Sequence, residues 1–537
     1  MLPLCAIAPI QNSVYLTAMA LIAGARTFHQ VRATVKVGFW KVMKVSWVTS
    51  PVCLAFAQNA IKPPFNSTPR TPKMKVSALF TALAAATSVI AIAVDLPAGV
   101  PRNIQEFREK HPVAKRAPHC RKTFTPRASE NAEDDISADL LNAIKSANNG
   151  GTVYLPKDQL FVIDEPLDLT FLNDIHIHLE GTIQFTDNVE KWQKNAFYHP
   201  FQRSLMFWKW GGKDVRIYGE GTIDGQGQRW WNEFSGAEIL DPDNDYLRPV
   251  LFFAEHIDNL HVEGILMKNS PVWHNFIVDS TNIFYEDVII SAQSNRAGVE
   301  PKNGDFFNSL NVDHIRINRV WVDSDDDCFS PKTNSTDIHV DTMYCNNSHG
   351  QSIGSLGQYE GEYVIVKDVV IENVWMLNGN NGARIKVWAG ENVAEGFVDN
   401  ITFRNFYSAN DDWPIFLDSC YFNVNAETCR KFPSKMKVSN VLFENFEGYS
   451  SGVRGRAVAR VSCSPAGGAG CENVKFVNFN VTSPCGGLSV IICDGVEGGL
   501  GVDCVPFDSP EAKAALADRC TNPEKAKIEA PWPVRDY

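Results

Sequence analysis

The chain has 537 residues, 44% of them hydrophobic, which is enough for a large core or for one long solenoid. Its formal net charge of -12, without any run of lysine and arginine, excludes the basic surface that nucleic-acid binding needs. Short runs of valine and isoleucine, interrupted by asparagine, predict a strand-rich protein after about residue 165.

The first predicted element in chain order is a secretory leader at residues 74–93. It begins with lysines around Met74, continues as an alanine-rich apolar stretch and ends at Ala91-Ile92-Ala93. A charged start, an apolar core and an A-x-A end are typical of a signal peptide, and a membrane anchor is the alternative. We therefore expect a secreted protein with no membrane contact after the leader is removed. Residues 1–73 are interpreted as a mispredicted or unstructured extension.

The segment after the leader differs in composition from the rest of the chain. Residues 94–135 are polar and contain proline and arginine, so we expect a pro-region or a segment that leads into the fold. Residues 135–148 have the apolar spacing of a short amphipathic helix. We expect this helix to cap one end of a solenoid. At the other end, residues 521–537 are expected to form a C-terminal tail.

Residues 136–520 contain an imperfect repeat. Each copy has an alternating strand, a polar corner of one or two residues at Asn, Asp or Gly, and a second strand. Side chains that alternate with a period of two predict strands, and copies spaced roughly 20–45 residues apart predict stacked coils. Together they predict an all-β, single-domain, right-handed parallel β-helix. A β-sandwich is the alternative, but the hairpin turns it needs are rare between these strands. The copies are at residues 215–223, 260–267, 283–290, 315–322, 364–371, 401–406, 441–446 and 474–479.

Eleven of the thirteen cysteines follow Met74, which leaves one thiol unpaired if the others form disulfides. The absence of any C-x-x-C pair argues against a metal site, so we expect neither a metal nor a cofactor. Closely spaced cysteines in a secreted protein indicate local disulfides. The predicted pairs are Cys420 with Cys429, Cys463 with Cys471, and Cys485 with Cys493.

Four sequons are compatible with glycosylation during export. Together with the leader and the cysteine pairs, they predict an extracellular glycoprotein, which we expect to be a monomer. The sequons begin at Asn334, Asn346, Asn400 and Asn480.

Acidic side chains recur at intervals of about one coil. Asp305 and Asp326 are 21 positions apart, and Asp327 and His349 are 22 apart. Adjacent coils of a β-helix stack about 4.8 Å apart, so these side chains are expected to share one face. Clustered carboxylates repel one another, so at least one should stay protonated and suit a general acid, while the ionised ones activate water. Taken singly, these aspartates and the histidine would be read as turn or structural residues.

Two cations follow the acids. Arg384 and Lys386 are two positions apart, so on a strand they face the same side and offer paired positive charge to a carboxylate. Alone, such a pair is usually an exposed strand face. Acids that cleave a glycosidic bond beside cations that hold an acidic sugar predict an acidic polysaccharide as the partner.

These motifs resemble glycoside hydrolase family 28, the pectin-cleaving polygalacturonases and their relatives. The family's Asn-Thr-Asp, Gly-Asp-Asp, Gly-His-Gly and Arg-Ile-Lys motifs correspond to residues 303–305, 325–327, 348–350 and 384–386. Residues 348–359 are especially similar to the fungal exo-polygalacturonases. The resemblance covers roughly residues 120–520.

The resemblance implies an exo-polygalacturonase that releases galacturonate from the non-reducing end of pectate with inversion of configuration. In this reading Asp326 is the general acid, Asp305 and Asp327 activate the water, and His349 supports the protonation state of the acid. The implied substrate-binding residues are Arg384, Lys386, Tyr421 and Asn303, and the implied disulfide joins Cys328 to Cys345.

Three departures from the family pattern lie in or beside the two motifs that carry the aspartates. Gly304 replaces a threonine or serine, and Phe306 and Asp325 each replace a glycine. If position 306 needed a positive φ, Phe306 would strain its turn. Three alternatives therefore stay open: a hydrolase of rhamnogalacturonan or xylogalacturonan, a degenerate pectin-binding β-helix without catalysis, and a calcium-dependent pectate lyase on a similar solenoid.

Overall fold

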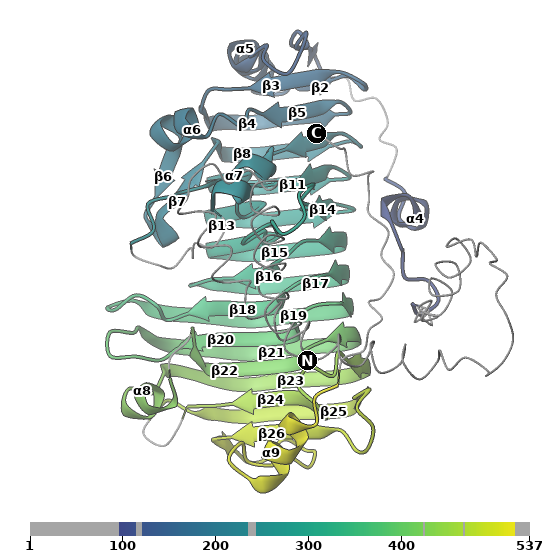
Figure 1. Cartoon of the computed structure of the whole chain (residues 1–537). Helices are drawn as coiled ribbons and strands as arrows, with labels where there is room; N and C mark the ends of the chain where they lie inside the picture. Colours follow the sequence, from purple (N-terminus) through teal and green to yellow (C-terminus); the bar gives the residue numbers. More distant parts are fainter. Residues whose placement is uncertain (1–95, 114–120, 235–242, 423–424, 465–467, 521–537) are drawn as a thin grey trace, which may run out of the picture. The chain divides into compact units, whose positions relative to one another are not determined.

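The computed structural model describes residues 96–113, 121–234, 243–422, 425–464 and 468–520. The predicted extension (1–73), leader (74–93) and tail (521–537) lie outside the described residues, as does Cys120. Within the described residues, 24 strands pair in one continuous wound sheet, and all of its pairings are parallel (Figure 1). The prediction of a right-handed parallel β-helix is therefore confirmed.

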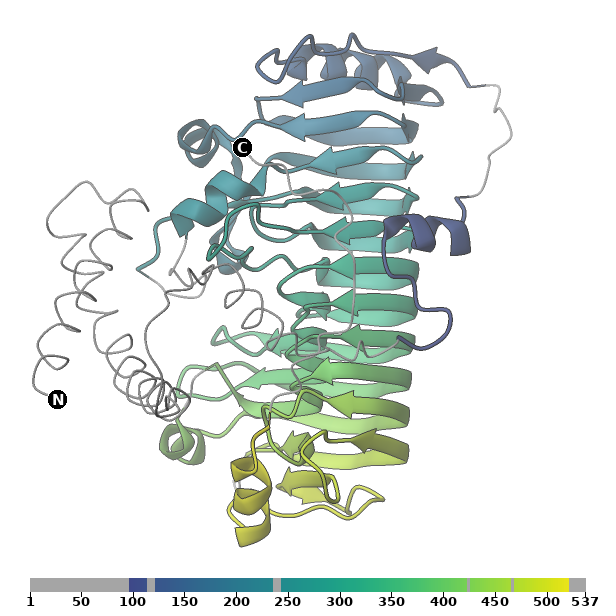
Figure 2. The same ribbon diagram turned by 45° about the vertical axis from the view of Figure 1, so that its right-hand side comes forward.

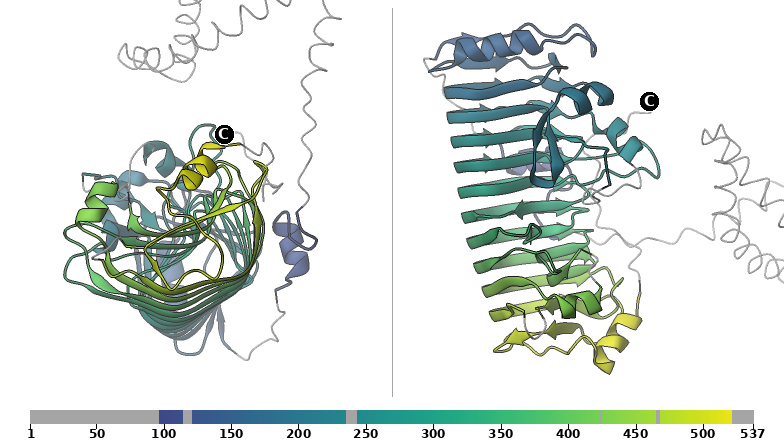
Figure 3. Two further views of the ribbon diagram at one scale, coloured as in Figure 1. Left: turned by 90° about the horizontal axis from the view of Figure 1, so that it is seen from below. Right: turned by 90° about the vertical axis from the view of Figure 1, so that its left-hand side faces the viewer.

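The strands stack in three columns around the helix axis (Figure 3). The interior that they enclose is apolar. The longest column consists of β1 (Thr123–Phe124), β2 (Thr152–Leu155), β4 (Leu167–Leu179), β8 (Trp208–Tyr218), β11 (Phe252–Glu263), β13 (Asn275–Glu286), β15 (Phe307–Asp323), β17 (Ser335–Asn346), β19 (Tyr363–Leu377), β21 (Glu395–Asp411), β23 (Lys435–Ser450), β25 (Cys471–Thr482) and β27 (Val496–Glu497).

The other two columns are built from shorter strands. The second column contains β3 (Leu160–Ile163), β5 (Thr182–Phe185), β9 (Thr222–Asp224), β12 (Leu266–Lys268) and β14 (Ile289–Ser291). The third, which carries the site described below, contains β16 (Asp327–Pro331), β18 (Gly350–Leu356), β20 (Asn381–Trp388), β22 (Trp413–Tyr421), β24 (Ala457–Ser462) and β26 (Val490–Asp494).

Asparagines at the corners explain why the repeat is visible in the sequence. Asn373, Asn405, Asn445 and Asn478 all have positive φ, a conformation that asparagine tolerates better than most residues. Their side-chain amides form a ladder. The last three each donate to the asparagine one coil earlier at 2.9 Å. The first, Asn373, donates to Asp341 at 2.7 Å. The predicted polar corners are therefore confirmed as stacked turns.

The interior is filled by aliphatic and aromatic side chains in register. Phe403 stacks on Phe443 with ring centroids 5.3 Å apart, and Phe406 stacks on Phe446 at 4.8 Å. Each pair occupies equivalent positions on neighbouring coils, because the register joins Phe403 to Phe443 and Phe406 to Phe446. This register fixes which outward residues share a face.

Helices cover the ends and one side of the coil stack. The predicted capping helix is confirmed as α5 (Ser137–Ala147), whose Leu140, Ala143 and Ile144 are buried against the first coil. A small sheet of β6 (Phe197–His199), β7 (Ser204–Met206) and β10 (Pro249–Val250) lies outside the coils. The remaining helices of the described residues are α4 (Ile104–Lys110), α6 (Val189–Asn195), η1 (Phe201–Arg203), α7 (Gly227–Phe234), α8 (Ala426–Lys431) and α9 (Pro510–Ala517).

Residues 96–113 lie along the outside of the coils (Figure 2). Phe107 of α4 is fully buried and packs edge-on against Tyr344, with centroids 6.1 Å apart. Arg108 donates to the backbone oxygens of Gly264 and Asp287. No helix within the described residues is long and apolar enough to cross a bilayer.

The structure contains five disulfides among the described cysteines, and it corrects one prediction. Cys420–Cys429 and Cys463–Cys471 form as predicted. The predicted pair Cys485 with Cys493 is wrong, because Cys485 bonds to Cys520 and Cys493 bonds to Cys504. Cys493 lies within β26, and Cys485 lies in the preceding turn beside Gly452, so spacing in the chain did not reflect spacing in the fold. The fifth bond joins Cys328 to Cys345.

Candidate active site

The predicted acidic residues meet on one face of the β-helix. Asp305 lies in the loop before β15, Asp326 immediately precedes β16, and Asp327 is the first residue of β16. One carboxylate oxygen from each lies within 4.8 Å of the others. His349 precedes β18 on the next coil, and Asp327 pairs in register with Gly350. The predicted juxtaposition of these four residues is therefore what the structure shows.

Asp326 is held by a network that favours its anion. His349 Nδ1 lies 3.0 Å from Asp326 Oδ1, which also accepts a hydrogen bond from the amide of Asp327 at 2.8 Å. The side-chain amide of Asn303 donates to Oδ2 at 3.3 Å. Burial raises the pKa of Asp326, but the charge and hydrogen bond of His349, with the charge of Lys386, lower it further, so its pKa lies below the ordinary value.

His349 shows the opposite shift. Burial lowers the pKa of this imidazole, but the adjacent charge of Asp326 outweighs burial and raises the pKa to about 9. The His349 side chain is 37% exposed and that of Asp326 14%, so the pair borders solvent. At neutral and acidic pH the pair therefore holds one shared proton, which lies on the histidine before substrate binds.

Asp327 is enclosed by donors. It is 1% exposed and accepts hydrogen bonds from Ser352 Oγ at 2.6 Å and from Ser330 Oγ at 3.2 Å. The ammonium of Lys386 forms an ion pair with the same carboxylate. Burial lowers the pKa of Lys386, whereas the charge of Asp327 raises it, and the net shift is upward. Lys386, which was predicted to bind substrate, therefore also holds Asp327.

Asp305 has no such enclosure. It is 4% exposed, and no described residue donates a hydrogen bond to its carboxylate. Burial and the charges of Asp326 and Asp327 raise the pKa of Asp305 well above its ordinary value, and Lys332 and Lys386 oppose that shift. Asp305 therefore takes up a proton more readily than Asp326 does.

Lys332 belongs to the site but was missed in the sequence. It is 3% exposed, and its ammonium donates to the oxygen of Gly354 at 2.9 Å and to Ser330 Oγ at 2.5 Å. Burial and the charge of Lys386 lower the pKa of Lys332 to about 8, while the acids oppose this. Its five-residue separation from Asp327 was the only available signal, and it was too weak to use without the strand register.

Arg248 is a second residue that the sequence did not reveal. It is buried, its guanidinium lies 3.6 Å from the ring centroid of Phe234, and it donates to the oxygens of Pro271 and Lys302 at 2.7 Å. It also donates to Asn303 Oδ1 at 2.7 Å. The amide of Asn303, predicted to bind substrate, is thereby oriented toward Asp326.

Two departures from the family pattern compensate each other. Asp325 Oδ1 accepts a hydrogen bond from the amide of Gly304 at 3.1 Å. A Cβ at position 304 would lie 2.7 Å from that oxygen and 2.5 Å from Ser324 Oγ, so the glycine makes room for the extra acid. Burial and the charge of Asp326 raise the pKa of Asp325 to about 6.

The expected strain at Phe306 is absent. Its φ is not positive, and its side chain is fully buried against Tyr285 and Phe307 with centroids 5.9 and 5.8 Å apart. Its amide donates to the oxygen of Asp327 at 3.0 Å. Phe306 therefore lies in the bend just before β15, where its aromatic ring packs into the interior.

Arg384 and Tyr421 complete the predicted set. Arg384 points outward from β20, and its guanidinium lies 5.4 Å from the ring centroid of Tyr421. The ammonium of Lys386 lies at the same distance from that ring. Burial raises the pKa of Tyr421, so its hydroxyl stays protonated and can donate to an anion. The substrate-binding roles of these residues stay predictions.

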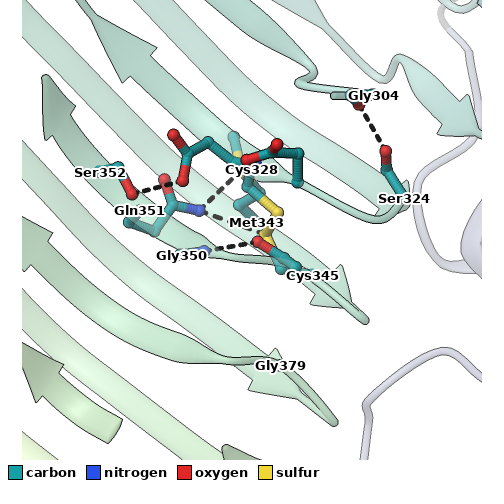
Figure 4. The surroundings of a disulfide bond; sticks show 12 residues. Gly304, Ser324, Cys328, Met343, Cys345, Gly350, Gln351, Ser352 and Gly379 are labelled. Atoms are coloured by element: carbon teal, nitrogen blue, oxygen red, sulfur yellow. Dashed lines mark hydrogen bonds between the residues drawn. A yellow bond between two sulfur atoms is a disulfide. The ribbon is translucent and has the colours of Figure 1, made fainter. Parts of the chain in front are cut away.

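The disulfide implied by the resemblance lies directly under the site (Figure 4). Cys328 follows Asp327 and is joined to Cys345, with Cα atoms 6.4 Å apart. Gln351 donates to Cys345 Sγ at 3.3 Å, and the next residue, Ser352, donates to Asp327. The bond thus ties the strand of the acid to the neighbouring coil.

The acids also lie close enough to ligate a divalent cation. However, Lys386 is already paired with Asp327, His349 is paired with Asp326, and Lys332 is nearby. A divalent cation would have to displace these charges, so the donor set fits a metal poorly.

The sequons differ in accessibility. Asn334, Asn400 and Asn480 are exposed. Asn346 is 6% exposed, its amide donates to Asp323 at 2.8 Å, and its oxygen accepts from Asn378 at 2.8 Å. The folded protein therefore has no room for a glycan at Asn346, whereas the other three sequons stay predicted sites.

The chain is similar to known proteins of one family. A family model described as glycosyl hydrolases family 28 matches residues 151–504. The probable exopolygalacturonase B of Emericella nidulans is 52% identical over 386 residues, covering 72% of this chain and 87% of that protein. Exopolygalacturonase B of Aspergillus niger is 48% identical over 389 residues, covering 72% and 88%. The crystal structure of an endo-xylogalacturonan hydrolase from Aspergillus tubingensis is 28% identical with a TM-score of 0.63, covering 72% of this chain and 99% of that one.

Proposed function

This chain belongs to glycosyl hydrolase family 28, and from that premise we propose that it is a secreted exo-polygalacturonase. It would hydrolyse α-1,4-galacturonosyl linkages of pectate and release galacturonate from the non-reducing end. The observation that carries this proposal is the identity of about half of all aligned residues with exopolygalacturonases over most of their length. The three grouped acids beside Arg384 and Lys386 support the same substrate class.

The proton for the leaving group would come from the Asp326–His349 pair. Before binding, the proton lies on His349. A sugar placed over the pair excludes water, and a low dielectric favours the neutral acid and neutral imidazole over the ion pair. Asp326 would then protonate the glycosidic oxygen as the bond from that oxygen to the anomeric carbon breaks.

The water would be activated between Asp305 and Asp327. Lys386, Ser352 and Ser330 occupy the lone pairs of Asp327, which suits it to orient the water as a fixed anion. Asp305 has its carboxylate free of such donors and a raised pKa, so it is the better acceptor of the water's proton. Attack of this water on the anomeric carbon completes the hydrolysis.

The stereochemistry is a separate proposal. The resemblance implies inversion, but carboxylate oxygens within 4.8 Å of each other lie below the roughly 6.5–9.5 Å that is usual for inverting enzymes. A group of three acids offers more than one acid–base pair, so the closest pair does not define the outcome. Proton NMR of the first product formed distinguishes the β anomer, expected for inversion, from the α anomer.

One alternative substrate has an observation in its favour. The 28% identity with an endo-xylogalacturonan hydrolase of the same fold keeps xylogalacturonan as a candidate. Chromatography of the products from polygalacturonate and xylogalacturonan decides between them. Galacturonate as the single early product from polygalacturonate supports the exo proposal. Mixed oligomers from the start contradict exo action, and a clear preference for xylogalacturonan contradicts the substrate.

A further inference from the structure

Three arginines on the coils that follow the acids each have a guanidinium nitrogen without a hydrogen-bond partner. They are Arg384 on β20, Arg454 in the turn before β24, and Arg460 on β24. Among the described residues, none of the three forms an ion pair, and in each the Nε atom is buried without a hydrogen-bond partner. Leaving a buried charged donor unpaired is costly, so such groups indicate a place that an anion completes.

Arg384 and Arg460 occupy the same file of side chains. The register pairs Arg384 with Phe416, and Phe416 with Arg460. Their chain neighbours Ile385 and Val461 belong to the interior, so both arginines project from the outer face. Two strand spacings separate their backbones by roughly 9–10 Å along the axis of the β-helix.

Aromatic rings pack against the guanidinium groups of Arg460 and Arg454. The guanidinium of Arg460 lies 4.4 Å from the ring centroid of Phe507 and 5.7 Å from that of Phe416. The guanidinium of Arg454 lies 5.6 Å from the ring of Trp413. A guanidinium packed on a ring keeps its N–H edges available for a planar carboxylate.

In the part of the chain that the structure describes, the nearby acids Asp418 and Asp494 form no ion pair with Arg454 or Arg460, although their charges favour the charged form of Arg460. Asp418 accepts from the amide of Cys420 at 2.9 Å, and Asp494 accepts from the amide of Phe507 at 3.2 Å. Within the described residues, the hydrogen bond formed by the Arg460 guanidinium goes to Ser462 Oγ, at 3.5 Å. Burial lowers the pKa of Arg460, the two acids raise it, and the like charge of Arg454 lowers it. An added anion would relieve this repulsion.

We propose that Arg460, assisted by Arg454, is a subsite for a second carboxylate of an acidic polysaccharide, beyond the one bound by Arg384. The inference rests on the proposed function. An enzyme that removes the terminal sugar needs room for one unit on one side of the acids and for the polymer on the other. All three unpaired arginines lie on the C-terminal side, so the polymer extends in that direction.

The test compares rates on galacturonate oligomers from dimer to hexamer for the wild type and Arg460→Gln. In the wild type, kcat/KM should rise with length until the subsite is filled. The variant should match the wild type on the dimer and fall by about tenfold on the longer oligomers, the usual effect of one charge-assisted contact. Arg460→Lys should recover part of the loss, since it keeps the charge without the planar fork.

Arg404→Gln is the matched control, because Arg404 lies on β21, away from this face, and pairs with Glu372 and Glu444. Methyl-esterified oligomers lack the carboxylate charge, so wild type and Arg460→Gln should act on them equally. An equal loss at every length, or no loss at any length, overturns the subsite. If the wild type released galacturonate from no oligomer, the proposed function would fail instead.

Discussion

Lys332 gives a direct test of the electrostatics of the site. It is predicted to lower the pKa of Asp305, so Lys332→Met should raise that pKa and move the acidic limb of the rate profile to higher pH. Its ammonium is 2.5 Å from Ser330 Oγ, which is 3.2 Å from Asp327, whose carboxylate is within 4.8 Å of Asp305. The attraction between the Lys332 ammonium and the Asp305 carboxylate, across about 8 Å at an effective dielectric constant of about 20, is roughly 2 kcal/mol. This corresponds to a change of about 1.5 units in the pKa of Asp305.

The assay is kcat/KM on a galacturonate oligomer across the acidic pH range, since this parameter reports the free enzyme's groups. Lys332→Arg keeps the charge and should leave the limb near its wild-type position. Lys209→Met removes a lysine that pairs with Glu255 away from the acids and should have no effect. Thermal melting at each pH separates a shifted limb from unfolding. An acidic limb that stays in place in Lys332→Met would refute the assignment of Asp305 as the base.

Three further predictions follow from contacts of the site. Asp326→Asn should lower kcat by about 10²–10⁴-fold while calorimetry shows oligomer binding little changed, and near-normal turnover would refute its role as the acid. The His349–Asp326 pair should stabilise the fold most between about pH 4 and 6.5 and lose this as pH rises toward 9 or falls below 4, because the pKa of His349 is raised and that of Asp326 lowered. Solvent exposure limits the effect to about 1 kcal/mol, and His349→Gln should remove this contribution to the pH dependence of the melting temperature. Gly304→Thr should destabilise by about 1–3 kcal/mol, and adding Asp325→Gly should restore part of the loss, because the contact with Ser324 Oγ remains; equal melting temperatures of the single and double variants would contradict the coupling.

The fold could be predicted because its repeat is local. Each corner is an asparagine or aspartate followed by alternating strand residues, and one coil brings equivalent positions together without further information. The disulfides show the limit of that reasoning. Cys485 is eight residues from Cys493, yet Cys485 reaches Cys520 across 35 residues because the last segment folds back over the final coils. A pairing of this kind depends on how a loop returns, and the strand repeat does not encode it.

The site was predictable to the extent that its members belong to the repeat. Asp305, Asp327 and His349 follow at one-coil intervals, so their meeting followed from the period. Arg248 reaches Asn303 across 55 residues from a segment outside the coils, so no period signals it. The protonation pattern was also out of reach, because it depends on which acid faces His349 and which faces Lys386.

The charges of the site explain why the departures from the family pattern need not abolish activity. Asp325 adds a carboxylate beside Asp326, which would by itself raise the pKa of Asp326. His349 and Lys386 outweigh it, since the pKa of Asp326 still lies below its ordinary value. The repulsion between the two acids mainly changes the protonation of Asp325 itself, because the pKa of Asp325 rises to about 6. Below about pH 6, Asp325 would be largely neutral and would donate or accept hydrogen bonds as a polar group. The added residue then changes the shape of the turn, which Gly304 accommodates, more than it changes the charge that the substrate meets.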